Sequence, residues 1–202
     1  TSFNIPRSVT RIDPGAFERC TSLTSLNIPV SVTKIGDRAF YGCKSLVSLI
    51  IPDSVTEIGD SAFEECSRLV RLNIPDSVET IGDSAFERCT SLAFYSENPL
   101  IIPDSVTEIG VNAFNECSRL ESVTIGNLVT EIGDKTFYGC SKLTEVNIPD
   151  SVETIGDSAF YGCIRLESVT IGNSVTTIGN GVFSAIKTNA TITISQTVLG
   201  NL

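Results

Sequence analysis

The sequence predicts a repeat solenoid, a rod built from stacked copies of one short motif. The first observation is a strict period, because an isoleucine opens a new copy every 23 residues, with one longer interval of 28. The openings are Ile5, Ile28, Ile51, Ile74, Ile102, Ile125, Ile148 and Ile171, and a partial copy follows at Ile194. Fixed periods of about 20–50 residues are the signature of solenoids and related arrays.

The second observation is that the same apolar residue type returns at matching positions of the copies. One column is Phe17, Phe40, Phe63, Phe86, Phe114, Phe137, Phe160 and Phe183. Another is Cys20, Cys43, Cys66, Cys89, Cys117, Cys140 and Cys163. One copy cannot bury these side chains, but stacked copies bury each against its counterparts. We therefore expect both columns to be structural ladders inside the rod.

Each copy is expected to contain one short strand, as in the segment from Leu69 to Ile74. There Leu72 and Ile74 alternate with Arg71 and Asn73, which is the two-residue period of a half-buried strand. Pro75 ends this strand because proline has no amide hydrogen to donate to a sheet. Stacking the copies places these strands side by side in parallel.

The segment between strands is expected to turn the chain back across the rod. The stretch from Gly82 to Glu87 is typical of a turn or a short helical turn. Ser84 and Glu87 have the spacing of a capping box, which favours a helical turn.

The period is broken once, by five extra residues near 93–99. Insertions in repeat arrays map to loops, often on the binding face. The inserted Phe94 and Tyr95 are candidate ligand anchors, since aromatic residues often dominate binding interfaces. They are equally candidates for filling a gap in the interrupted core.

Because the repeat continues on both sides of this insertion, we expect residues 1–202 to form a single solenoid of eight copies and a partial ninth. The motif degenerates at the C-terminal end, where residues 186–202 are expected to form a cap. At the other end, Phe3 and Ile5 start their ladders with nothing stacked before them. We expect the chain to be a piece of a longer array, or to form an edge-to-edge homodimer by two-fold antiparallel pairing of its N-terminal strand.

Composition argues against several functions. The net charge of −10 argues against nucleic-acid binding, which needs a basic surface. No apolar run approaches the roughly 20 residues of a membrane-spanning helix, so we expect no membrane insertion. Histidine, the commonest general base and metal ligand, is absent. With no paired catalytic groups and no phosphate-binding loop, we expect no enzyme and no cofactor.

Two columns of polar residues raise the alternative of a metal site. The cysteines lack the clustered pairs that zinc sites use, which favours a buried thiol ladder. Rows of aspartates, such as Asp37, Asp60 and Asp83, could hold calcium through carboxylate oxygens. Aspartate is also common in turns and before helical turns, and we favour that interpretation.

The pattern Leu-x-x-Leu-x-Ile-Pro-x-x-Val-x-x-Ile-Gly-x-x-Ala-Phe-x-x-Cys resembles the BspA-like leucine-rich repeats, and the match covers nearly the whole chain. The resemblance implies a horseshoe or right-handed superhelix with parallel strands on its concave face. Members of this family are typically surface or secreted proteins that bind host proteins, matrix components or other cells. The resemblance therefore implies a non-enzymatic adhesion or binding module at the cell surface or secreted, with any signal or anchor outside this sequence.

We expect a protein or glycan ligand to contact the concave strand face and the insertion. The candidate contacts are Arg71, Asn73, Phe94, Tyr95, Ile101, Thr124, Glu145 and Asn147. The alternative function is an intracellular interaction scaffold, since seven unpaired thiols are easier to maintain in a reducing compartment.

Overall fold

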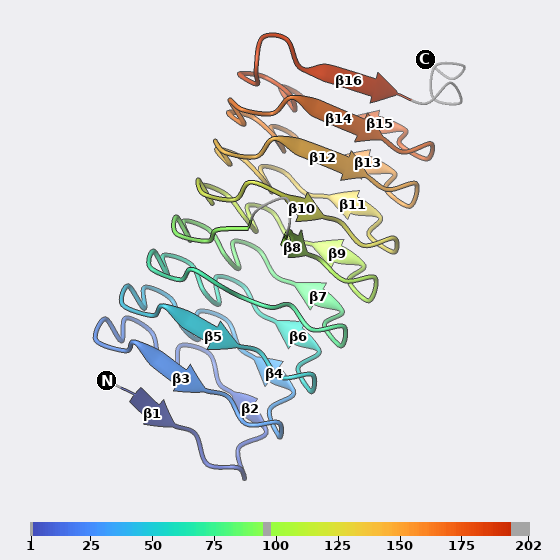
Figure 1. Ribbon diagram of the computed structural model, residues 1–202. Coiled ribbons are helices and arrows are strands. Elements are labelled where there is room, and N and C mark those ends of the chain that lie inside the picture. The colour runs from blue at the N-terminus through green and yellow to red at the C-terminus, as the bar shows by residue number, and fades with distance from the viewer. Residues whose placement is uncertain (1, 95–97, 195–202) are drawn as a thin grey trace.

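The computed structural model describes residues 2–94 and 98–194, which form one rod of stacked coils (Figure 1). Two rows of strands run along it, and every strand pair between described residues is parallel. This architecture confirms the predicted solenoid of stacked parallel strands.

The first row contains the strands predicted from the alternating segment before each proline. Its members are β1 (Ser2–Asn4), β3 (Ser25–Asn27), β5 (Ser48–Ile50), β8 (Leu100–Ile101), β10 (Val123–Thr124), β12 (Glu145–Ile148), β14 (Ser168–Ile171) and β16 (Thr191–Ile194). We call the outward surface of this row the strand face. Alternate residues point to opposite sides, as in β12, where Glu145 and Asn147 are exposed and Val146 and Ile148 are buried.

The second row was not expected from the sequence, and it is the more regular of the two. It contains β2 (Arg11–Ile12), β4 (Lys34–Ile35), β6 (Glu57–Ile58), β7 (Thr80–Ile81), β9 (Glu108–Ile109), β11 (Glu131–Ile132), β13 (Thr154–Ile155) and β15 (Thr177–Ile178). All eight belong to one sheet. Strands of two residues give almost no periodic signal, so only the stacking of the copies reveals them.

The segment between the second row and the cysteine column is a turn. The expectation of a short helical turn there is wrong. The amide of Phe63 donates to the carbonyl of Ala85 in the next copy at 2.8 Å, so it is not available for a helical bond within its own copy. Ser84 has a φ of 54°, and its hydroxyl lies 2.7 Å from a Glu87 carboxylate oxygen. This side-chain contact replaces the predicted capping box. The described residues contain no helix.

The first row is interrupted near the insertion. Strands β1, β3 and β5 form one sheet, β8 and β10 a second, and β12, β14 and β16 a third. Single bridges join Ser48 to Arg71 and Ser122 to Glu145. The five extra residues shift the chain between Arg71 and β8, so regular pairing stops there while the second row continues.

The core lies between the two rows. From Phe17 to Phe183 the phenylalanine rings stack with centroids between 5.1 and 5.7 Å apart. The six inner rings are fully buried, whereas Phe17 and Phe183 are partly exposed. Because neighbouring copies supply the burial, each inner ring contributes roughly 2–3 kcal/mol that the end rings gain only in part.

Candidate functional site

Three of the predicted contact residues come together on the strand face. Thr124 in β10 and Glu145 and Asn147 in β12 line a hollow of about 390 Å³. Pro99, Ser122, Ser168 and Thr170 also line this hollow. The parallel register places Glu145 beside Ser168 and Asn147 beside Thr170, so these side chains face the same space.

The hollow offers hydrogen-bonding groups and one carboxylate. Hydroxyl and amide groups both donate and accept, and the Glu145 carboxylate only accepts. Such a set can hold hydroxyl, amide or cationic groups of a ligand, but it has no nucleophile paired with a base. Periodicity alone places Ser122, Ser168 and Thr170 on this face. It does not show that they converge, nor that Pro99 from the insertion closes one side.

Asn73 has a structural task that the sequence did not reveal. Its side-chain oxygen accepts the Ile51 amide at 3.0 Å, and its side-chain nitrogen donates to the Ile51 carbonyl at 2.9 Å. The amide side chain thus replaces strand pairing at the point where the first row is interrupted. Because of these two bonds, we expect a substitution of Asn73 to lower the stability of the rod, whether or not Asn73 also contacts a ligand.

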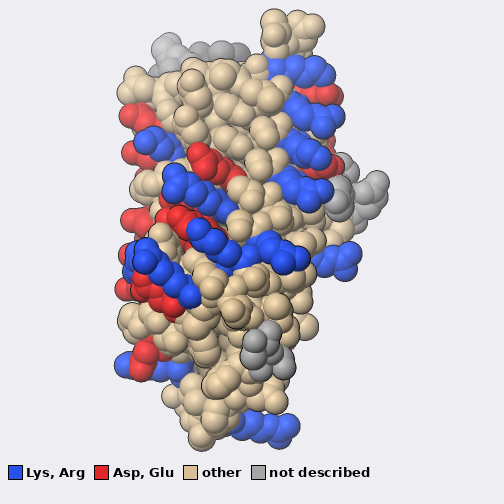
Figure 2. All heavy atoms as spheres, turned by 90° about the vertical axis from the view of Figure 1, so that its left-hand side faces the viewer, with Lys and Arg blue, Asp and Glu red and all other residues tan. Residues whose placement is uncertain are grey.

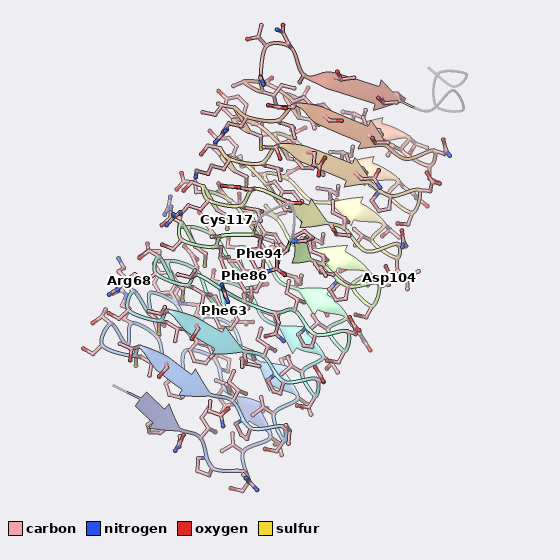
Figure 3. The ribbon with its side chains drawn as sticks, viewed as in Figure 1. Phe63, Arg68, Phe86, Phe94, Asp104 and Cys117 are labelled. Atoms are coloured by element: carbon pink, nitrogen blue, oxygen red, sulfur yellow. The ribbon has the colours of Figure 1, made fainter. Side chains whose placement is uncertain are left out.

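Phe94 is buried, with 6% of its surface exposed, and it belongs to the hydrophobic core. Figure 3 labels Phe94 together with Phe63 and Phe86, which belong to the same core cluster. Its carbonyl accepts the Glu121 amide at 3.0 Å, which ties the insertion to the following copy. Because Phe94 is buried, it fills the gap in the interrupted core and is not exposed to anchor a ligand. Tyr95 lies outside the described residues.

Arg71 and Ile101 are exposed on the strand face but lie outside the polar hollow. The exposed fraction of Ile101 is 56%, which is unusual for an isoleucine in a repeat rich in buried ones. The predicted contacts therefore separate into a polar group and a group next to the insertion.

The cysteine column is a ladder of buried thiols. Six of the seven are buried, and Cys20 is exposed. Each buried thiol donates to a phenylalanine carbonyl of the preceding copy, for example Cys66 to Phe40 at 3.2 Å. Burial raises the pKa of Cys43 to about 11 and that of Cys163 to about 12. A raised pKa means few thiolates, so these sulfurs are poor nucleophiles and poor metal ligands.

Aspartates of the repeated column form hydrogen bonds between neighbouring copies. Asp37 accepts the backbone amide of Asp60 at 3.1 Å, and Asp60 accepts that of Asp83 at 2.9 Å. A Cβ added to Gly82 would lie 2.7 Å from the backbone nitrogen of Asp60, so glycine lets the copies approach closely. The aspartates lie in turns, as the favoured interpretation has it, and their carboxylates bind the backbone of the next copy instead of capping a helical turn. Within residues 2–94 and 98–194, no three Cys, Asp or Glu side chains are grouped to hold a metal ion.

Charged side chains gather on the side of the rod where the chain turns towards the first row, as Figure 2 shows. Basic and acidic residues of different copies pair there, including Arg38 with Glu18 at 2.7 Å and Lys44 with Glu65 at 3.0 Å. The hydrogen bond from Arg38 lowers the pKa of Glu18. Such exposed pairs contribute little to stability.

No helix in the described part of the chain has the length and apolar character needed to cross a bilayer.

Comparison with known proteins identifies the repeat. The family described as "BspA type Leucine rich repeat region (6 copies)" matches residues 1–98 and 93–200. A T. pallidum leucine rich repeat protein shares 34% identity over 82% of this chain and 77% of its own, with a TM-score of 0.74. A leucine rich cell surface protein from Faecalibacterium prausnitzii A2-165 shares 31% identity, with a TM-score of 0.59. That match covers 99% of this chain and 62% of the other. No curated protein matches the sequence.

Proposed function

Since this chain belongs to the BspA-type leucine-rich repeat family, we propose that it is a non-enzymatic binding module that holds a protein or glycan ligand on its strand face. Proteins built from these repeats are generally interaction or surface modules. The polar hollow around Glu145 and Asn147 carries the proposal for this chain. It is a recess between β10 and β12, whose two sheets are joined by a single bridge, and hydrogen-bonding groups line it.

Two threonines beside the second row differ from the residues of the polar hollow. Immediately before β4 and β15, the exposed Thr33 and Thr176 help to hold the copies together, since their hydroxyls donate to backbone carbonyls of preceding copies at 3.3 Å. In the described part of the chain, no hydrogen bond or ion pair involves the side chains of Glu145 and Asn147. Polar groups free of internal partners can exchange water for a ligand without loss of stability.

A cell-surface location is part of the proposal, and adhesion is the role that suits it. It is supported by the similarity to the F. prausnitzii cell surface protein. The alternative is an intracellular interaction scaffold. The seven free cysteines favour it, because unpaired thiols persist most easily in reducing compartments.

The binding role is tested by screening the protein against arrays of glycans and immobilised matrix proteins, followed by the double substitution Glu145→Gln/Asn147→Ala. Losing a charged hydrogen bond costs about 1.5–3 kcal/mol, so affinity should fall roughly ten- to hundredfold. Glu131→Gln in β11 is the matched control, because Glu131 is exposed on the second row. Equal affinity of the double variant and the control would place the ligand elsewhere.

A further inference from the structure

Four aliphatic side chains are exposed on the part of the strand face next to the insertion. Exposed fractions are 38% for Val47, 74% for Ile50, 37% for Val70 and 56% for Ile101. In other copies the position of Ile50 and Ile101 is held by Asn27, Asn73, Thr124, Asn147 and Thr170. The position of Val47 and Val70 is held by Thr24, Glu121, Thr144 and Glu167. Stacking of the copies does not require aliphatic residues at these outward positions.

The four side chains come from adjoining parts of the structure. The Val70 amide donates to the Val47 carbonyl at 2.9 Å, so these two residues are neighbours in the stack. Ile50 ends β5, and Ile101 ends β8 beyond the interruption of the first row. Asn73, which occupies the intervening copy, turns its amide to the Ile51 backbone. We call Val47, Ile50, Val70 and Ile101 the apolar patch.

Two arginines accompany the patch. Arg71 follows Val70 and is bridged through its backbone to Ser48, and Arg68 belongs to the same copy. Both are exposed, and neither takes part in any of the ion pairs between described residues. The Arg71 guanidinium is therefore available to a carboxylate of a ligand.

We propose that the apolar patch, together with Arg71 in the copy between Ile50 and Ile101, docks an extended protein segment that presents aliphatic or aromatic side chains beside a carboxylate. Exposed apolar surface rimmed by polar groups marks interaction sites. Interface centres are apolar with arginine enriched, and arginine binds carboxylates in a bidentate fork. The inference rests on the proposal that the strand face binds ligand, but it uses residues outside the polar hollow.

The test uses soluble nine-residue peptides with blocked ends in fluorescence polarisation. One set alternates aliphatic or aromatic residues with glutamate, a second replaces the glutamates by lysine, and a third replaces the apolar residues by serine. We expect the glutamate set to bind at least tenfold more tightly than the other two.

The decisive variants use residues that the chain itself places in other copies. Ile50→Thr/Ile101→Thr introduces the residue that Thr124 and Thr170 supply at the same repeat position. It should weaken peptide binding at least tenfold without lowering the melting temperature. Arg71→Glu should reverse the preference from glutamate to lysine peptides. Ile164→Thr is the control, because Ile164 is 60% exposed in the turn next to the cysteine column.

The outcomes separate this inference from the proposed polar site. Peptide binding that is lost in the Ile50/Ile101 variant and kept in Glu145→Gln/Asn147→Ala supports the patch, even if the hollow binds nothing. Absence of peptide binding up to about 1 mM, or a glutamate preference unchanged by Arg71→Glu, would overturn the patch. Either result leaves glycan or protein binding by the hollow to be judged by its own variants.

Discussion

At the scale of single residues, position in the repeat does not decide role. Asn73 and Asn147 occupy the same position in two copies, and both are exposed. Asn73 makes two bonds to the Ile51 backbone, whereas Asn147 faces the polar hollow. The difference arises because Asn73 lies outside any paired strand, whereas Asn147 pairs with Thr170 of the next copy.

This pair gives a matched stability prediction. Asn73→Ala should lower the free energy of unfolding by about 1–3 kcal/mol, since it removes two hydrogen bonds to backbone groups. Asn147→Ala should change it by less than about 0.5 kcal/mol. Urea denaturation followed by circular dichroism measures both. Equal effects of the two substitutions would mean that the Asn73 bonds do not replace sheet pairing.

At the scale of the element, the turn is set by bonds between copies. Two residues per turn have positive φ, such as Lys135 with 54° and Gly162 with 75°. Residues with side chains adopt this conformation at a cost of roughly 1–2 kcal/mol, which the inter-copy amide bonds offset. A sequence window of one copy contains none of those bonds, and for that reason it suggests a helical turn.

The strain at Lys135 can be measured directly. Lys135→Gly should raise the free energy of unfolding by about 0.5–1 kcal/mol, because glycine adopts positive φ without a steric cost. Gly162→Ala, the reverse exchange at the second turn position, should lower it by about 1 kcal/mol or more. A destabilising Lys135→Gly in thermal or urea unfolding would contradict this account of the turn.

At the scale of the whole molecule, burial divides the seven thiols. A thiol reagent should modify Cys20 rapidly in the native protein and the other six only after denaturation, because their raised pKa values and burial suppress thiolate attack. Counting modified cysteines by mass spectrometry tests this. Fewer than seven reactive thiols in denatured, unreduced protein would indicate disulfides and contradict the ladder.

Pairing of β1 with the β1 strand of a second copy stays a prediction. Phe3 is 52% exposed there, and a hollow of about 640 Å³ lies between Phe3, Phe17, Cys20 and Leu23. Light scattering over a concentration series tests the pairing alternative, and if dimers form, Phe3→Ser should shift the equilibrium towards monomers. A strict monomer at all concentrations would rule out the edge-to-edge homodimer.

The sequence by itself determined the solenoid, the first row of strands and the inward columns of phenylalanine and cysteine. These follow from the 23-residue period and the two-residue alternation within each copy, since one copy is too small to bury its apolar side chains without the copies stacked on it. The tertiary structure decided the second row, the non-helical turns, the burial of Phe94 and the task of Asn73. Each of these depends on hydrogen bonds or contacts between copies. The division of the strand face into a polar hollow and an apolar patch is of the same kind, because outward residues gain their neighbours only when the copies are stacked.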